Sequence, residues 1–221
     1  MTDHGERLSI PTPSGPVSGV YARPDGADAT VVVAHGAGAG MDHPFMVGYC
    51  DALNGLGVAT LRFNFAYMES GSRVPDRPPK AIAVWAAAVE EARRRSSGEP
   101  LWAAGKSFGG RMASMACADG AMATAGLVFL GYPLHPVGKP EKIRDEHLYG
   151  LGLPMLFLQG TRDTLATREL LDAVVAKLPT ATLTWFEGAD HSFALKGVKR
   201  TPYAIGASLA APTAEFVRRK A

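Results

Sequence analysis

The sequence is poor in cysteine, carries no strong excess of charge of either sign and contains no long apolar run. Its two cysteines, Cys50 and Cys117, lie in segments of helical periodicity without the close spacing of a metal site or a redox pair, so we expect two small buried side chains. Charged residues make up 20% of the chain, and the formal net charge is +2. Because no field of one sign results, we expect neither a nucleic acid nor a membrane as a partner.

We also expect no segment that directs the chain to a membrane or out of the cell. No stretch approaches the ~18 apolar residues that are needed to span a bilayer. The segment from Met1 to Arg7 contains acidic and basic side chains and is followed by no apolar run, so we expect no secretion signal. The 221 residues suffice for a sizeable core, and we expect one domain over residues 1–221 of a cytoplasmic protein.

Short apolar segments rich in Val, Leu and Phe alternate along the chain with longer segments of helical period. This alternation predicts an α/β protein with a mostly parallel central sheet flanked by helices. Leu8–Ile10 and Val17–Tyr21 are separated by Pro- and Gly-rich sequence, which favours an antiparallel hairpin at one edge of the sheet. The other predicted strands are Thr30–Ala34, Val58–Phe63, Leu101–Ala104, Leu127–Leu130, Met155–Gln159 and Leu183–Phe186.

Apolar stripes at helical spacing predict the helices between these strands. One stripe begins at Ile82 and ends in the basic run 93–95, where cations complement the helix dipole. A second stripe, over residues 170–178, follows Thr167, a favourable residue type for the N-cap. The run Asn54-Gly55-Leu56-Gly57 predicts the left-handed stop of an earlier helix.

The stretch AAGKSFGG, residues 103–110, is compatible with two different chemistries. Its Gly-Lys-Ser triplet is typical of a phosphate-binding loop, whereas the five residues from Gly105 to Gly109 match the G-x-S-x-G turn of a nucleophilic serine. A phosphate loop needs a glycine five residues before Gly105, but that position is Pro100, which has no N–H to donate. The spacing therefore favours the serine turn.

A strand, a sharp turn at Ser107 and a helix from Phe108 account for the small residues of this stretch. Such a turn forces Ser107 into an unfavourable backbone conformation, and side chains at Gly105 or Gly109 would then collide with neighbouring backbone. We expect Gly110 to permit close packing of the helix. The Ser107 hydroxyl would lie at the helix N-terminus, where the dipole favours developing negative charge.

A serine hydroxyl needs a base, and the base needs a carboxylate that orients it. Asp163 follows one predicted strand and His191 follows the next, and each interval leaves room for a helix and a strand. We therefore predict that Ser107, His191 and Asp163 form the catalytic group. Asp190 is the rival acid, but a residue usually points away from the side chain of its neighbour. His35 is expected to anchor its loop.

Stabilisation of an oxyanion requires two backbone donors. The N–H of Phe108, directly after the serine, is one predicted donor. The other is expected in the glycine-rich loop of residues 35–40, where the Ala37 N–H is the preferred donor and Gly38 the alternative. This loop does not match the dinucleotide-binding pattern G-x-G-x-x-G, because Met41 stands where the last glycine would be.

Four motifs, HGAGAG, GKSFGGR, GTRD and GADHSF, resemble the α/β-hydrolase superfamily, in particular its compact dienelactone-hydrolase-like branch. GKSFGGRMAS and the following GYPLHPVGKPEKIRDEH are similar to a small group of predicted hydrolases, which includes a testis-expressed protein and a subunit of a chromatin acetyltransferase complex. The resemblance implies the α/β-hydrolase fold, a Ser107–Asp163–His191 triad and hydrolysis of carboxylic esters or related acyl substrates. Dienelactone hydrolases typically have a cysteine nucleophile, so Ser107 does not carry over their particular reaction.

Many members of this superfamily insert a lid domain before the acid, but Gly131 to Pro154 is too short for one. We therefore expect an open site and small or protruding substrates. The bordering loops contribute Phe65, Tyr67 and Tyr132, which we predict to bind substrate. Lys106 is expected to point into solvent, and the alternative is that it adds positive potential beside the nucleophile. A basic outer rim would suit an ester with a carboxylate, although ordinary solvated loops explain it equally well: Arg73, Arg77, Lys80 and Lys139.

The predicted reaction is acyl transfer to water through a covalent ester on Ser107, with His191 as base and then acid and Asp163 fixing the imidazole tautomer. No metal or cofactor is expected. The expected partner is a small-molecule acyl ester, and the chain is expected to be a monomer or a homodimer. The alternative is a catalytically inactive binding or scaffold protein with the same fold. A serine peptidase is a third reading, which only the open site favours.

Overall fold

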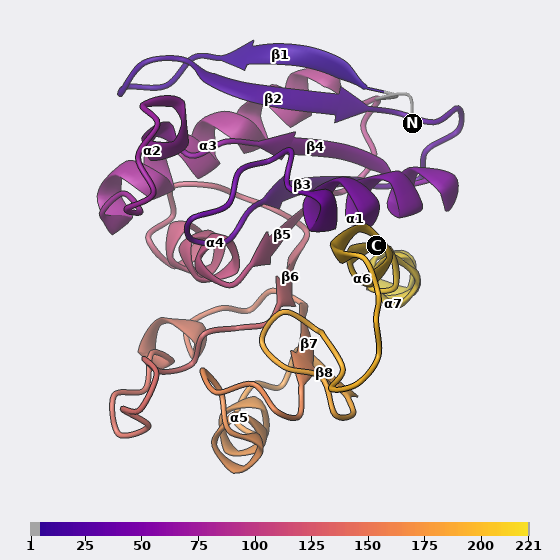
Figure 1. Cartoon of the computed structure of the whole chain (residues 1–221). Helices are drawn as coiled ribbons and strands as arrows, with labels where there is room; N and C mark the ends of the chain where they lie inside the picture. Colours follow the sequence, from indigo (N-terminus) through magenta and orange to yellow (C-terminus); the bar gives the residue numbers. More distant parts are fainter. Residues whose placement is uncertain (1–4, 221) are drawn as a thin grey trace.

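Eight strands form one sheet in the computed structural model, which describes residues 5–220 (Figure 1). Part of the segment considered for a secretion signal, Met1 to His4, lies outside the described residues. In spatial order the strands are β1 (Glu6–Ile10), β2 (Val17–Ala22), β4 (Ala59–Phe63), β3 (Thr30–Ala34), β5 (Leu101–Lys106), β6 (Gly126–Leu130), β7 (Met155–Gly160) and β8 (Ala181–Phe186).

The predicted strands are all present, with ends shifted by no more than one or two residues. β1 and β2 form the predicted antiparallel hairpin at one edge, and β2 pairs antiparallel with β4. All other neighbouring pairs, from β4–β3 to β7–β8, are parallel. The mostly parallel α/β sheet expected from the sequence is therefore confirmed.

Helices cover both faces of this sheet (Figure 1). On one face α1, α6 and α7 lie together, and on the other α3 packs against α4. The short α2 and the amphipathic α5 complete the helical layers. The bounds are α1 Pro44–Gly55, α2 Ala66–Glu69, α3 Pro78–Arg95, α4 Phe108–Ala118, α5 Arg168–Val175, α6 Pro202–Ala207 and α7 Ala210–Lys220.

Two hydrophobic cores lie on opposite faces of the sheet because successive side chains of a strand point to opposite sides. In β3, Val32 and Ala34 pack into the core beneath α3, α4 and α5. Val31 and Val33 pack into the other core, beneath α1, α6 and α7. Burial on both faces explains why the central strands are continuously apolar rather than alternating.

The helix ends largely follow the sequence signals. α3 ends in Arg93, Arg94 and Arg95, and the segment after α1 contains Gly57 in the left-handed region with φ of 80°. Thr167 is the residue before α5, but its side chain forms no capping hydrogen bond. The preference for threonine at the N-cap thus predicts the start of α5 correctly, although the hydrogen bond that usually explains this preference is absent at Thr167.

The order of strands β4, β3 and β5 creates a position where a ligand can bind. The chain passes from β3 to β4 on one side and returns to β5 on the other, so the loops after β3 and β5 meet at the carboxyl ends of adjacent strands. Ligands of open α/β sheets bind at such switch points. Residues 131–154 contain a short 3₁₀ helix, Glu146–Leu148, and no inserted domain in the described chain. Within residues 5–220 no helix has the length and apolar character required to cross a bilayer.

Candidate active site

Ser107 forms a strained turn between β5 and α4. Its backbone has φ of 48° and ψ of −111°, a conformation that residues with a side chain seldom adopt. Ser107 directly precedes the first residue of α4, and its carbonyl accepts the Arg111 N–H at 3.1 Å. The hydroxyl therefore lies at the positive end of the helix dipole, as the strand–turn–helix pattern predicts.

The glycines around Ser107 are required by close backbone contacts. A Cβ atom on Gly105 would lie 2.1 Å from the backbone nitrogen of Gly110, and one on Gly109 would lie 2.7 Å from the carbonyl oxygen of His35. A Cβ on Gly110 would in turn lie 2.7 Å from the carbonyl oxygen of Gly105. These clashes confirm the steric reason for the glycine pattern, because backbone atoms cannot move aside as a flexible side chain can.

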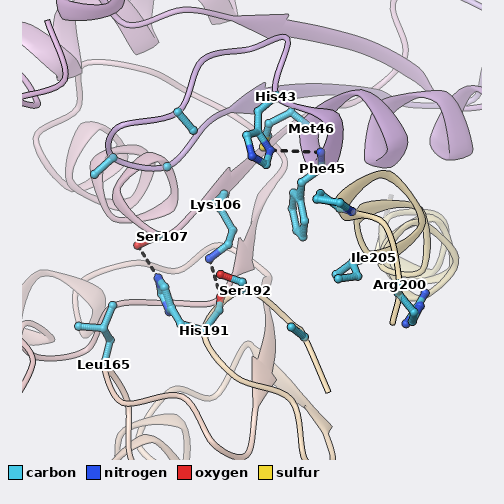
Figure 2. Close-up of a pocket in the computed structure, with 15 residues that line it drawn as sticks. His43, Phe45, Met46, Lys106, Ser107, Leu165, His191, Ser192, Arg200 and Ile205 are labelled. Carbon is cyan, nitrogen blue, oxygen red and sulfur yellow. Dashed lines mark hydrogen bonds between the residues drawn. The ribbon is translucent and has the colours of Figure 1, made fainter. Parts of the chain in front are cut away.

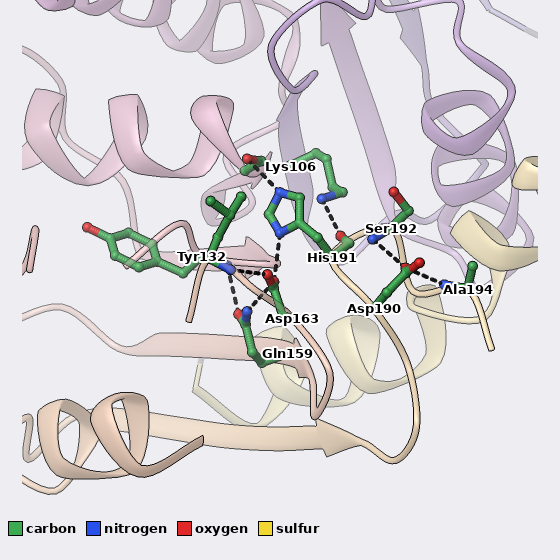
Figure 3. A network of polar contacts seen from close by, with 10 residues as sticks. Lys106, Tyr132, Gln159, Asp163, Asp190, His191, Ser192 and Ala194 are labelled. Carbon is green, nitrogen blue, oxygen red and sulfur yellow. Dashed lines mark hydrogen bonds and ion pairs between the residues drawn. The ribbon is translucent and has the colours of Figure 1, made fainter. Parts of the chain in front are cut away.

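His191 connects Ser107 to Asp163 through its two ring nitrogens; Figure 2 shows the contact with Ser107, and Figure 3 shows the contact with Asp163. Its Nε2 lies 2.9 Å from the Ser107 Oγ, and its Nδ1 lies 2.6 Å from Oδ2 of Asp163. The His191 side chain is 25% exposed, whereas the Asp163 side chain is fully buried. A buried carboxylate on Nδ1 leaves Nε2 free to accept the hydroxyl proton, which is the arrangement that activates a serine.

The carboxylate of Asp163 is held by two further donors. The Gln159 side-chain amide donates to Oδ2 at 2.6 Å, and the Leu165 N–H donates to Oδ1 at 2.8 Å. Gln159 is itself fixed because its Oε1 accepts the Tyr132 N–H at 2.8 Å. Sequence reasoning missed Gln159, although one amide at the end of the otherwise apolar strand β7 was a usable signal, since buried polar groups need partners.

Asp190 organises its own loop instead of orienting the neighbouring imidazole. Its Oδ1 accepts the N–H groups of Ser192 at 2.8 Å and Ala194 at 3.0 Å. Phe193, between them, has a positive φ of 62°. The loop that carries His191 is thus a tight, locally bonded turn, and the Nδ1 partner of His191 is Asp163 rather than the rival acid.

Lys106 points inward, so the expectation that it faces solvent is wrong. Its Nζ donates to the carbonyl oxygen of His191 at 2.7 Å (Figure 2). The same atom lies 5.8 Å from the centre of the Phe193 ring. Burial lowers the pKa of this ammonium from 10.5 to about 8, even though the carboxylates of Asp163 and Asp190 act in the opposite direction. Sequence reasoning missed this contact because it joins segments that are far apart in the chain.

Of the two predicted oxyanion donors, Phe108 directly follows Ser107 and Ala37 lines the same pocket as Ser107. Phe108 opens α4, and Ala37 lies in the loop after β3, beside the pocket that Ser107 lines. Within residues 5–220, neither the Phe108 N–H nor the Ala37 N–H has a hydrogen-bond acceptor in the protein. Gly38, the alternative, has a positive φ of 72°. Both predicted N–H groups are thus unsatisfied by the fold itself.

His35 anchors the loop that contains Ala37, as expected. Its Nδ1 lies 2.8 Å from the Gly36 carbonyl oxygen, and its Nε2 accepts the Phe65 N–H at 3.1 Å. Acceptance at Nε2 places the ring proton on Nδ1, so the imidazole is neutral. Burial lowers the pKa of His35 to about 4, which keeps the ring neutral at ordinary pH.

A cavity of about 660 Å³ opens beside Ser107 (Figure 2). Its apolar wall comes from the start of α1, the start of α6 and the loops after β7 and β8: Phe45, Met46, Leu165, Ala194, Pro202 and Ile205. Its basic and titratable side chains are those of His43, Lys106, His191 and Arg200. An apolar cavity with a few polar groups beside a nucleophile is the usual form of a small-molecule site.

The three aromatic residues predicted to bind substrate do not line this cavity. Phe65, Tyr67 and Tyr132 are almost completely buried, because their rings pack in the core beneath α3 and α4. The Phe65 ring lies 5.2 Å from that of Phe108, so Phe65 packs against the residue that follows the strained turn at Ser107. The residues of the predicted basic rim do not line the cavity either: Arg73, Arg77, Lys80 and Lys139.

A sequence model described as an alpha/beta hydrolase domain matches residues 27–217. The chain belongs to the alpha/beta-hydrolase family. Hydrolysis is therefore the reaction class that this family membership supports, in agreement with the resemblance found in the sequence.

Solved structures of other hydrolases share the fold over nearly their whole length. A serine hydrolase homologue from Coxiella burnetii is 21% identical, with 97% of this chain and 96% of that chain covered and a TM-score of 0.72. A serine hydrolase without a lid from Xanthomonas campestris is 21% identical, with 99% and 96% covered and a TM-score of 0.74. Dienelactone hydrolase from Anabaena variabilis is 19% identical, with 98% of both chains covered and a TM-score of 0.77.

Proposed function

We propose that this hydrolase cleaves carboxylic esters or related small acyl substrates through an acyl-enzyme on Ser107. The observation that carries the proposal is the pair of contacts of His191, at 2.9 Å to the Ser107 hydroxyl and at 2.6 Å to the Asp163 carboxylate. Together they supply a nucleophile, a base and the group that fixes the base, which is the minimum that serine needs at neutral pH.

In the first half-reaction the Ser107 Oγ bonds to the acyl carbon while its proton passes to Nε2 of His191. The acyl oxygen becomes an oxyanion, for which the N–H groups of Phe108 and Ala37 are the proposed donors. Collapse of this intermediate breaks the bond to the leaving alkoxide, which takes the proton from His191. In the second half-reaction a water oxygen bonds to the acyl carbon while His191 accepts a proton from that water. The bond between the acyl carbon and the Ser107 Oγ then breaks, His191 returns the proton to this oxygen, and the carboxylic acid leaves.

The shape of the site supports small acyl substrates. The cavity beside Ser107 is mostly apolar and no inserted domain covers it within the described chain, so an acyl group of modest size has access to the nucleophile. Similarity to a lidless serine hydrolase and to a dienelactone hydrolase is in accord with this substrate class.

Labelling with a fluorophosphonate probe tests the proposed nucleophile. The wild-type chain is expected to react, and Ser107→Ala is expected to lose both labelling and turnover of short p-nitrophenyl esters. Ser97→Ala is the matched control, because Ser97 is exposed and lies before the opposite end of β5. A burst of p-nitrophenol close to one equivalent per chain would reveal the acyl-enzyme.

Two results would contradict the proposal. Labelling that persists in Ser107→Ala would place the nucleophile elsewhere. A folded wild-type chain that neither reacts with the probe nor turns over the esters would instead be a catalytically inactive binding or scaffold protein on the same fold.

A further inference from the structure

We propose that Lys106 is a positioning residue that fixes the backbone of His191 relative to the nucleophile. This inference rests on the proposed function and deepens it, since it concerns how the base is kept in place. Its central observation is the bond of 2.7 Å between the Lys106 Nζ and the His191 carbonyl oxygen (Figure 3).

The connection is short because Lys106 and Ser107 are adjacent in the chain. Ser107 contacts the imidazole of His191, and Lys106 contacts the carbonyl of the same residue. The nucleophile and the base are therefore tied together twice, once through the ring and once through the main chain. The bond to Lys106 holds the main chain of His191 directly, whereas the bonds to Ser107 and Asp163 hold only its ring.

Apart from Lys106, the loop of His191 is held by bonds within itself and by bonds to the loop after β7, where the Arg162 N–H donates to the Ala189 carbonyl oxygen at 2.8 Å. Asp190 accepts hydrogen bonds from the N–H groups of Ser192 and Ala194, and these bonds shape the turn without attaching it to the strained turn at Ser107. Among the described residues, Lys106 is the one that donates a hydrogen bond to the His191 carbonyl oxygen. Without this lysine, the turn would keep its internal shape and its bonds to the loop after β7 but would lose its main-chain attachment to the segment that carries Ser107.

Neighbouring residues leave a fitted space for the ammonium group. A Cβ atom on Gly131, which has φ of 74°, would lie 3.3 Å from the Lys106 Nζ and 3.4 Å from the His191 carbonyl oxygen. The absence of a side chain at Gly131 thus makes room for the bond. On the other side the Phe193 ring lies 5.8 Å from Nζ, a distance at which a ring face attracts a cation.

The charged surroundings show that Lys106 is not held by an ion pair. Asp163, after β7, and Asp190, after β8, act on the ammonium electrostatically, but neither forms an ion pair with it in the described chain. His191 presents its carbonyl oxygen, and His43 and Arg200 are the other titratable or charged groups of the adjoining cavity. The hydrogen-bond partner of the partly buried Lys106 ammonium is therefore the main-chain carbonyl of His191 and not a carboxylate.

Lys106→Met tests the proposal because methionine retains an unbranched apolar side chain and removes the donor. With the neutral substrate p-nitrophenyl acetate, kcat is expected to fall about 10- to 100-fold, the range expected when a reacting group is misplaced by about 1 Å. KM is expected to change by less than about threefold, because a neutral ester does not depend on the ammonium for binding. Lys177→Met is the matched control, since Lys177 is exposed beyond α5.

The pH dependence of the same variants separates positioning from a merely structural contribution. The pKa of Lys106 is about 8, so the charged donor is present below that pH and is lost above it. The ratio of wild-type to Lys106→Met kcat is expected to be largest below about pH 8 and to shrink above it, because a neutral amine is a weaker donor than an ammonium. The ratio of wild type to Lys177→Met is expected to stay near one throughout.

Hydrogen exchange supplies a readout that needs no turnover. Peptides covering residues 187–196 are expected to exchange faster in Lys106→Met than in the wild type or in Lys177→Met, while peptides from β5 and α4 are unchanged. Unchanged exchange together with a wild-type kcat would overturn the proposal, as would a loss confined to KM, which would make Lys106 a substrate contact. Faster exchange in a chain without esterase activity would retain the anchoring role and refute only the proposed function.

Discussion

The side-chain amide of Gln159 donates to the same Asp163 oxygen, Oδ2, that receives the N–H of His191, and both distances are 2.6 Å. Gln159 is fully buried and its own oxygen is occupied by the Tyr132 N–H. The amide therefore cannot rotate away without leaving two buried groups unpaired. This chain of bonds extends from the loop after β6, through the end of β7, to the imidazole.

Replacement of Gln159 tests whether this chain orients the acid. Gln159→Leu is expected to lower kcat/KM by about 10- to 100-fold, because a hydrogen bond to a charged group is worth about 1.5–3 kcal/mol. Gln159→Glu is expected to lose at least as much, since it would place a second carboxyl group against Asp163. Steady-state kinetics with p-nitrophenyl acetate measure both. A Gln159→Leu variant with the kcat/KM of the wild type would show that Gln159 only fills space.

The strain at Ser107 predicts an unusual order of stability among inactive variants. Glycine normally destabilises a structured position relative to alanine by about 0.5–1 kcal/mol, but φ of 48° with ψ of −111° penalises any Cβ atom. Ser107→Gly is therefore expected to be more stable than Ser107→Ala, with a free energy of unfolding that is about 1 kcal/mol higher. Urea denaturation of the two variants gives the comparison. Both lack the hydroxyl, so a more stable alanine variant would mean that the turn carries no strain.

The parts of the site that the sequence predicted are those set by steric and topological rules. Gly105 and Gly109 were predictable because the strained turn at Ser107 brings backbone segments together. Asp163 and His191 were predictable because both follow strands of a parallel sheet, and carboxyl ends of such strands share one edge. Neither inference needed the conformation of a side chain.

The parts that the sequence did not predict depend on where side chains point. Lys106 was expected in solvent, yet Gly131, directly after β6, has no side chain and leaves an inward path for it. Tyr132 was expected in the pocket, yet its ring is buried and it serves the site through its backbone N–H. Such outcomes follow from packing between segments distant in the chain, which residue type and local period do not specify.

Acid is expected to destabilise the fold through His35. The pKa of this buried imidazole is about 4 when folded and near 6.5 in the unfolded chain, so between these values only the unfolded chain gains the proton. Stability from this residue is complete above about pH 6.5 and falls as the pH drops toward 4, by about 3 kcal/mol in total. His35→Gln should show a shallower fall in the free energy of unfolding over this range. Equal slopes in urea titrations of both chains would contradict this role.

Lys106 is expected to lower stability at neutral pH while it supports activity. Burial disfavours its charged form, and its pKa of about 8 in the folded chain lies below the ordinary value of 10.5. Between these values the unfolded chain holds more protons, so the stability of the wild type rises with pH there, and the cost of the buried charge is present in full below about pH 8. Lys106→Met removes that cost.

The free energy of unfolding of Lys106→Met is accordingly expected to exceed that of the wild type at about pH 7, and the difference is expected to shrink as the pH approaches 10.5. Urea denaturation at several pH values, with Lys177→Met as the reference, measures the difference. A variant less stable than the wild type, with a gap independent of pH, would mean that the bond to His191 outweighs the burial of the charge. A more stable and less active variant would show that the charge is kept for its effect on the base.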